Sequence, residues 1–178
     1  MIAVYTITSG LHDEASVSRL SDEFLKSVFP EDGFVFKGAD FSDFGTHALD
    51  LIYVRTGGAE GIFKALLPEM LARGIDRYYL LTSGKSNSLA ASLEILSYLR
   101  QQGLKGEVLH GSDAYVAERI HALEQVQEAR ARLKGRRIGV IGQPSDWLIA
   151  SQADPIPPLG RLGNRTEEGP MEELLGGN

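Results

Sequence analysis

The sequence predicts an α/β fold: a doubly wound, three-layer parallel sheet of five to six strands, of the flavodoxin or Rossmann type. Short runs rich in β-branched and apolar residues alternate with longer amphipathic runs over residues 1–141. Strand–helix alternation with short connections favours a parallel sheet covered by helices. The short runs are mostly apolar throughout, which is typical of strands buried on both faces. Right-handed crossovers then give the doubly wound arrangement.

Each expected strand is a short apolar run bounded by turn residues. Residues 2–7 read Ile-Ala-Val-Tyr-Thr-Ile and are followed by Ser9-Gly10, and the second run is entered through Asp32-Gly33. The six expected strands are 2–7, 34–36, 49–54, 77–82, 107–109 and 137–141.

Each expected helix carries apolar residues at helical spacing on one face. Between residues 13 and 29, positions 17, 20, 24, 25 and 28 are all apolar, and Asp13 suits the N-cap. Gly74 and Gly103 follow two of the helices, where glycine favours the left-handed turn that ends a helix. The four expected helices are 13–29, 59–73, 88–102 and 113–134.

The chain is expected to contain three parts. Residues 1–135 form the α/β domain, and residues 136–153 form a strand and turn that resemble the start of a second domain. Residues 154–178 are expected to be an irregular or disordered tail, because residues 151–178 hold four of the seven prolines and five of the twenty glycines without apolar periodicity.

Composition excludes several classes of function. The 178 residues include 18 Lys and Arg against 24 Asp and Glu, a net charge of −6, which gives no general attraction to nucleic acid or anionic membranes. The absence of Cys excludes disulfides, thiolate metal sites and Cys nucleophiles. No signal peptide and no apolar run of about 20 residues is present, so a cytoplasmic location without membrane contact is expected.

Glycine-bearing polar loops follow four of the expected strands, at 8–10, 55–61, 82–88 and 142–147. In an open parallel sheet, ligands bind beyond the carboxyl ends of the strands, near the point where the strand order reverses. Backbone N–H groups, helix N-termini and hydroxyls there suit a phosphate, a carboxylate or a sugar. The candidate ligand-binding residues are Thr56, Gly57, Gly58, Glu60, Ser83, Gly84, Asn87 and Ser88.

Turns and helix caps alone are the alternative explanation for each single loop. Asn87 or Ser88 is expected to cap the helix that begins there, and Glu60 suits the first turn of a helix as well as it suits a sugar hydroxyl. The expected convergence of the loops at one edge is what favours a ligand site.

The established nucleotide-binding and hydrolase motifs are missing. The 56–61 loop has the wrong spacing for GxGxxG, and the 83–86 loop lacks the leading glycine of a P-loop. Ser83, His110 and Asp113 could be combined into a hydrolase triad, but no GxSxG supports one. A small hydrolase or transferase that uses Ser83 or His110 is one hypothesis for the function, beside the two given below.

Three blocks of sequence carry a family resemblance. They are RTGGAEGI at 55–62, LTSG at 81–84 followed by NSLAASLEIL at 87–96, and RIGVIGQPSDWLI at 137–149. In this order they resemble the N-terminal part of the L-fucose isomerase-like group of sugar ketol-isomerases, over roughly residues 1–150. That group implies a manganese-dependent aldose–ketose isomerase of several domains, whose metal ligands lie in later domains.

The resemblance implies an N-terminal domain that covers the substrate and takes part in oligomer assembly, not catalytic by itself. No catalytic residue, metal ligand or cofactor is therefore expected in this chain, and manganese is implied only for the full-length family. A small-molecule sugar and self-association are the expected partners. Since the resemblance fades after residue 153, the chain is expected to be a truncated or altered fragment. The alternative is a stand-alone sugar- or anion-binding α/β module without chemistry.

Overall fold

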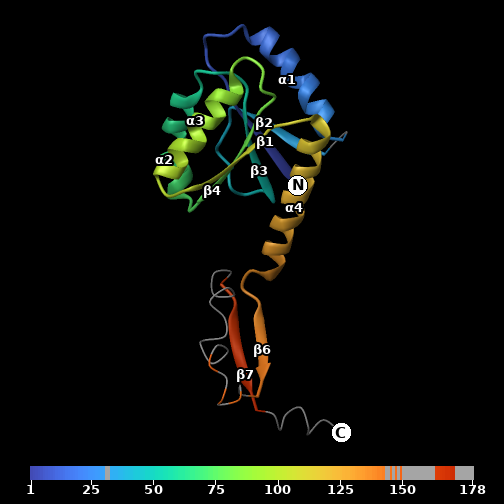
Figure 1. The fold of residues 1–178 in the computed structure, drawn as a ribbon, viewed down its shortest axis with the longest axis vertical. Coiled ribbons are helices and arrows are strands. Elements are labelled where there is room, and N and C mark those ends of the chain that lie inside the picture. The colour runs from blue at the N-terminus through green and yellow to red at the C-terminus, as the bar shows by residue number, and fades with distance from the viewer. Residues whose placement is uncertain (31–32, 143–144, 146, 148, 150–162, 171–178) are drawn as a thin grey trace. The chain divides into compact units, whose positions relative to one another are not determined.

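A computed structural model describes residues 1–30, 33–142, 145, 147, 149 and 163–170 (Figure 1). The chain divides into two compact units, Met1–Gln125 and Val126–Asn178. The boundary lies inside a helix, earlier than the expected end of the first domain at residue 135. In the described part of the chain, no helix is both long and apolar enough to cross a lipid bilayer.

The first unit contains a five-stranded sheet. Its strands are β1 (Ile2–Ile7), β2 (Phe34–Gly38), β3 (Leu49–Val54), β4 (Arg77–Leu81) and β5 (Lys105–Leu109). Their order is β2-β1-β3-β4-β5, and every neighbouring pair is parallel. This is the flavodoxin-type order, in which the chain reverses its direction of travel across the sheet between β1 and β3. The predicted fold class is confirmed.

Four helices cover the two faces of this sheet, and Figure 1 shows the resulting three layers. They are α1 (Glu14–Val28), α2 (Glu60–Ala72), α3 (Ser88–Gln101) and α4 (Asp113–Leu133). One apolar core joins α2 and α3 to the sheet and includes Phe63 and Ile95. The other joins α1 and the first half of α4 to the opposite face and includes Phe24 and Ile120. β1 is buried at all six positions, because it lies inside the sheet and between both cores.

The predicted helix boundaries rest on local geometry that the structure confirms. Asp13 accepts a hydrogen bond from Ser16 N at 2.9 Å and so caps α1. Gly74 and Gly103 follow α2 and α3 with φ of +79° and +72°, the left-handed conformation that glycine adopts without strain.

The sixth expected strand does not join this sheet. β6 (Arg137–Ile141) pairs in parallel with β7 (Arg165–Gly169) in a separate two-stranded sheet of the second unit. The expectation of an irregular tail over 154–178 is therefore wrong for β7. Its residues Arg-Thr-Glu-Glu-Gly carry no apolar pattern, so the strand is defined by backbone pairing, which sequence composition does not reveal. The other residues of 143–178, apart from 145, 147, 149, 163, 164 and 170, lie outside the described part of the chain.

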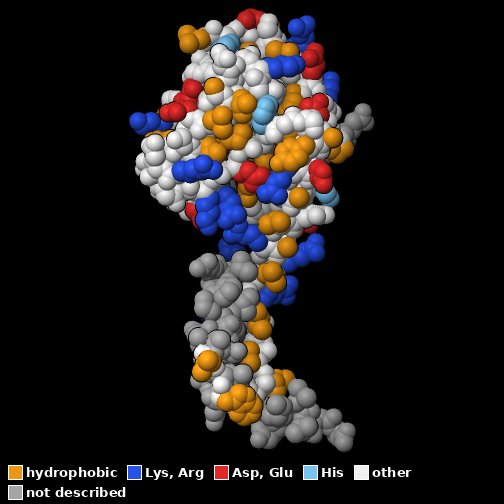
Figure 2. Space-filling view, viewed as in Figure 1, with side chains coloured by type: hydrophobic (Ala, Val, Ile, Leu, Met, Phe, Trp, Pro, Cys, Tyr) orange, Lys and Arg blue, Asp and Glu red, His pale blue; other side chains and the backbone are white. Residues whose placement is uncertain are grey.

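The surface of the first unit carries charges of both signs. On the face that Figure 2 shows, acidic and basic side chains are intermixed over this unit. Such mixing fits a chain whose net charge is only −6.

Candidate functional site

Three loops meet beyond the carboxyl ends of β1, β3 and β4. Gly57 N donates a hydrogen bond to Ser86 O at 2.8 Å, and a Cβ added to Gly57 would lie 3.0 Å from Asn87 Cβ. Gly58 has a φ of +78°, and a Cβ there would lie 3.0 Å from Ser9 Oγ. The loops after β1, β3 and β4 thus converge as the sequence predicted, and Gly57 and Gly58 are small because neighbouring loops come so close.

Thr56 holds the first two of these loops together from inside. Its side chain is fully buried, and its Oγ1 accepts the hydrogen bond of Ser9 N at 2.9 Å. Thr56 therefore positions the loop after β1 and does not face solvent. Glu60 begins α2 and is half-buried.

Ser88 and Asn87 differ from their expected capping role. The Ser88 hydroxyl is buried, accepts a hydrogen bond from Thr82 Oγ1 at 2.7 Å and donates one to Lys85 O at 2.6 Å. Asn87 occupies the N-cap position of α3, but its side chain makes no capping hydrogen bond. The expectation of an Asn87 cap is wrong because its backbone has a φ of +58°, whereas a capping side chain needs an extended backbone. Asn87 is instead exposed.

The end of β5 packs against the loop after β4. A Cβ on Gly84, whose φ is +77°, would lie 2.6 Å from His110 Cε1. His110 Nδ1 lies 3.3 Å from Thr82 O, and Ser83 Oγ accepts a hydrogen bond from Lys85 N at 3.4 Å. These contacts explain His110 and Ser83 as parts of the loop packing. The fourth expected loop, 142–147, follows β6, a strand of the separate two-stranded sheet, and its residues 143, 144 and 146 lie outside the described part of the chain.

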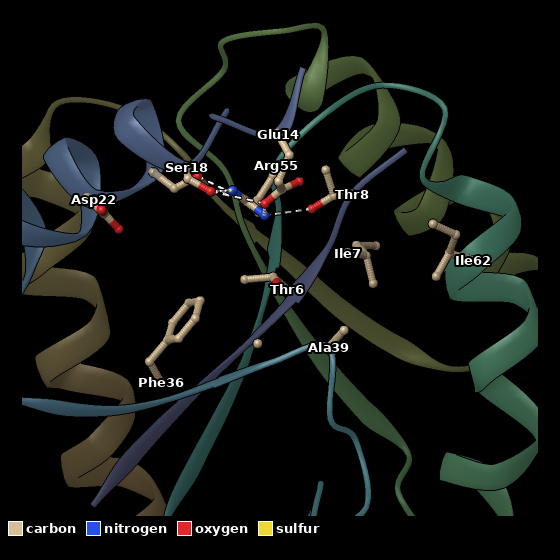
Figure 3. A pocket seen from close by; sticks show the side chains of 12 residues that line it. Thr6, Ile7, Thr8, Glu14, Ser18, Asp22, Phe36, Ala39, Arg55 and Ile62 are labelled. Atoms are coloured by element: carbon tan, nitrogen blue, oxygen red, sulfur yellow. Dashed lines mark hydrogen bonds and ion pairs between the residues drawn. The ribbon is translucent and has the colours of Figure 1, made fainter. Parts of the chain in front are cut away.

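A pocket of about 520 Å³ lies beside these loops, at the carboxyl ends of β1 and β2 and against α1 (Figure 3). Arg55, the first residue after β3, also lines it, so the pocket adjoins the point where the strand order reverses. Its lining residues are Thr6, Ile7, Thr8, Glu14, Ser18, Ser21, Asp22, Phe36, Gly38, Ala39, Arg55 and Ile62. None of the eight predicted ligand-binding residues belongs to this lining, although four of them directly follow Arg55 or lie within five residues of it.

Arg55 is the central polar group of the pocket. Its Nε donates to Ser21 Oγ at 2.9 Å, and its Nη2 donates to Ser18 Oγ at 2.9 Å. Its Nη1 donates to Thr8 Oγ1 at 3.1 Å and to the Glu14 carboxylate at 2.8 Å. Only 8% of the Arg55 side chain is exposed, against 67% for Glu14. The hydrogen bond from Arg55 holds the pKa of Glu14 below its ordinary value.

Apolar residues form another part of the pocket. Phe36 is 56% exposed on the edge strand β2, and Ile62 is 38% exposed in the first turns of α2. In Figure 3, Phe36 and Ala39 lie across the pocket from Arg55 and Thr8. The pocket therefore has a hydroxyl- and guanidinium-bearing side and an apolar side.

Arg55 is not among the eight predicted residues, because the prediction rested on the glycines that follow it in the sequence. A signal was available: Arg55 is a charged residue directly after a strand of buried apolar residues, and such a charge must find partners at the sheet edge. The hydroxyls of α1 that bind it, Ser18 and Ser21, gave no comparable signal, since serine is common on helix surfaces.

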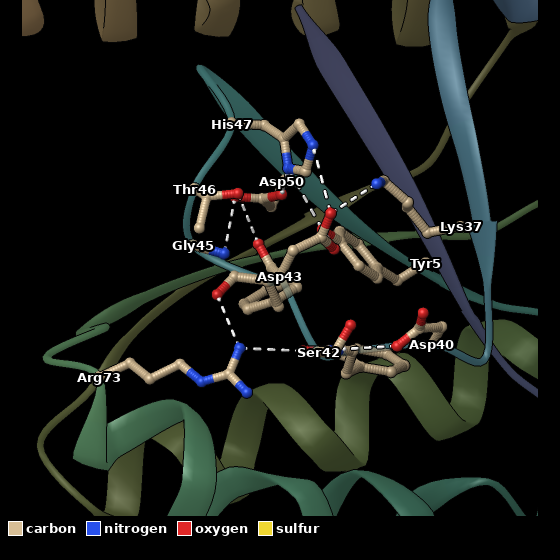
Figure 4. A network of polar contacts seen from close by, with 12 residues as sticks. Tyr5, Lys37, Asp40, Ser42, Asp43, Gly45, Thr46, His47, Asp50 and Arg73 are labelled. Carbon is tan, nitrogen blue, oxygen red and sulfur yellow. Dashed lines mark hydrogen bonds and ion pairs between the residues drawn. The ribbon is translucent and has the colours of Figure 1, made fainter.

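A second polar cluster holds the connection between β2 and β3 (Figure 4). This connection begins at Ala39, which lines the pocket. Tyr5 OH donates to Asp43 Oδ1 at 2.8 Å, and Lys37 Nζ donates to Asp43 Oδ2 at 2.5 Å. His47 Nδ1 lies 3.0 Å from Asp50 Oδ1 and 3.2 Å from Tyr5 OH. The cluster thus ties the connection to three strands, β1 through Tyr5, β2 through Lys37 and β3 through Asp50.

The pKa values of the two carboxyl groups in this cluster are shifted in opposite directions. The hydrogen bonds from Lys37 and Tyr5 lower the pKa of Asp43. Burial raises the pKa of Asp50, although contact with His47 opposes the shift. Burial and the neighbouring Asp43 raise the pKa of Tyr5 far above its ordinary value, so its hydroxyl stays a hydrogen-bond donor.

In the part of the chain that the structure describes, no group of three or more His, Asp and Glu side chains is arranged to hold a metal ion. No step through manganese is therefore assigned to these residues.

No family model matches the chain, and no curated protein sequence matches it.

Proposed function

We propose that this chain is a binding module that holds a small polar ligand, a sugar or related polyol, or an anion, in the pocket at the carboxyl ends of β1 and β2. The observation that carries the proposal is the position of the pocket next to the reversal of strand order, where doubly wound sheets bind their ligands. Its volume of about 520 Å³ is within the usual range for small-molecule sites.

The two sides of the pocket suit the two kinds of surface on a sugar. The hydroxyls of Thr8 and Ser18 and the carboxylate of Asp22 can exchange hydrogen bonds with ligand hydroxyls. The exposed ring of Phe36 offers a flat apolar surface to the C–H face of a sugar ring. Ser18 and Asp22 lie on α1, Phe36 lies on β2, and Thr8 directly follows β1.

The role of a substrate-covering, oligomer-forming domain of a sugar isomerase-like protein stays a prediction that rests on the sequence resemblance. The pocket supports the binding module independently of that resemblance.

An NMR titration tests the proposal. The ¹⁵N-labelled chain is titrated with a panel of neutral pentoses and hexoses and with inorganic phosphate, and we expect amide shifts concentrated at residues 6–8, 14–22, 36–39 and 55–62. Ala39→Trp places a large side chain into the pocket and is expected to abolish the shifts. Ala72→Trp is the matched control, because Ala72 is exposed at the far end of α2. Shifts at other residues only, or equal effects of the two variants, would contradict the proposal.

A further inference from the structure

The Arg55–Glu14 ion pair joins one buried charge to one exposed charge. The Arg55 side chain is 8% exposed and lies at the base of the pocket, whereas Glu14 is 67% exposed at its rim. A buried guanidinium needs a counter-charge, since an unpaired charge in the interior is strongly destabilising. An exposed carboxylate contributes little to the pair, because water solvates it almost as well.

Three hydroxyl groups hold the guanidinium in addition to Glu14. Hydroxyl groups of Thr8, Ser18 and Ser21 accept three of its hydrogen bonds, at 2.9 to 3.1 Å. Glu14 is likewise not needed to cap α1, because Asp13 accepts the hydrogen bond from Ser16 N. The Glu14 carboxylate, which also accepts a hydrogen bond from Ser18 Oγ at 3.0 Å, is thus needed neither for these three contacts of the guanidinium nor for the cap of α1.

We propose that the ligand of this pocket carries an oxyanion, a phosphate or a carboxylate, which replaces the Glu14 carboxylate on Arg55. The inference rests on the proposed function and narrows its ligand to a sugar phosphate, a sugar acid or a similar anionic small molecule. Glu14 then acts as an internal competitor that neutralises Arg55 in the free protein.

A neutral ligand cannot make this exchange. A sugar hydroxyl in place of Glu14 would leave the buried guanidinium without a counter-charge, so a neutral sugar has to bind beside the ion pair. An oxyanion offers Arg55 the same charge and the same acceptor geometry as a carboxylate. Asp22, the other acidic residue of the lining, is placed to accept hydrogen bonds from the uncharged part of the ligand and repels a second anionic group.

Removing the competing charge tests the exchange. Binding of glucose 6-phosphate, gluconate and neutral glucose to the full chain is measured by NMR titration at constant ionic strength. Glu14→Gln is expected to tighten binding of the two anions by up to about fivefold, the range of an exposed ion pair, and to leave glucose unchanged. Glu69→Gln is the matched control, because it removes the same charge from an exposed pair with Arg73 on α2, outside the pocket lining. Arg55→Lys is expected to weaken binding of both anions. If Arg55→Lys fails to fold, the Glu14→Gln measurement still tests the exchange.

The outcomes separate this inference from the proposed function. Tighter anion binding in Glu14→Gln but not in Glu69→Gln supports the exchange. Whether glucose 6-phosphate or gluconate binds more tightly shows whether phosphate or carboxylate is preferred. If glucose shifts the pocket amides but Glu14→Gln leaves both anions unchanged or weakened, the exchange is wrong and the binding module stands. Equal tightening in Glu69→Gln would overturn the exchange as a general charge effect. If none of the three probes shifts the pocket amides in either protein, the exchange and the binding module both fail.

Discussion

Replacing Thr56 with valine removes one oxygen atom from the interior and leaves the shape of the side chain almost unchanged. In the native protein that oxygen accepts the hydrogen bond of Ser9 N at 2.9 Å, and both residues are buried. Valine cannot accept it, so the Ser9 N–H loses its partner at a position that water does not reach. The loop after β1, which packs against Gly58, loses its anchor to the loop after β3.

An unsatisfied buried donor costs about 1 to 3 kcal/mol. The extra methyl group of valine offsets part of this, so we expect Thr56→Val to lower the free energy of unfolding by about 1 to 2 kcal/mol. Thr56→Ser keeps the acceptor and loses one methyl group, worth about 0.8 kcal/mol. The two variants therefore differ mainly in what happens to the Ser9 amide.

Urea unfolding gives the stability of each variant, and amide hydrogen exchange reports on Ser9 directly. We expect the Ser9 amide to lose its protection in Thr56→Val and to keep it in Thr56→Ser. A valine variant as stable as the native chain, with Ser9 still protected, would refute the account of Thr56 as the anchor of this loop.

Two further changes test the packing and the electrostatics of the first unit. Gly84→Ala should lose at least about 1 kcal/mol more stability in urea than Gly74→Ala. Both glycines have left-handed backbones, but an added Cβ meets a neighbouring side chain only at Gly84, where His110 Cε1 would lie 2.6 Å away. Equal losses would show that the His110 ring moves aside freely. Lys37→Met should destabilise the protein at pH 7, because the lowered pKa of Asp43 contributes stability above the ordinary carboxyl value of 3.8 that is lost as the pH falls through the native pKa. The loss should shrink as the pH falls below the ordinary carboxyl value, and a loss of the same size at pH 7 and in acid would contradict the pairing.

The fold followed from the sequence because local and long-range signals agreed. Residues 2–7 and 49–54 are apolar runs, and the structure buries them side by side inside the sheet. Asp13, Gly74 and Gly103 marked helix ends through conformational preferences that act within a few residues. Such signals need no knowledge of distant contacts.

The pocket could be placed only in part from the sequence, because its polar contacts join residues that lie far apart in the chain. The loops at 55–61 and 82–88 were expected to meet, and they do, because parallel strands bring their carboxyl ends to one edge. The bonds of Arg55 depend on where α1 crosses that edge, and this position is set by packing against the sheet. Asn87 or Ser88 was expected to cap α3, but neither side chain does. The contact between this loop and Gly57 accompanies a left-handed backbone at Asn87 that local propensity does not predict.

The central place of β1 has a consequence for synthesis of the chain. It leaves the ribosome before the other four strands of its sheet, yet both of its edges stay unpaired until β2 and then β3, which ends at Val54, have followed. At about 5 to 20 residues per second, that interval lasts roughly 2 to 10 s. During it, an apolar hexapeptide of high β-propensity is available to other nascent chains. A chaperone that binds β1 until β3 emerges would therefore raise the yield of folded protein.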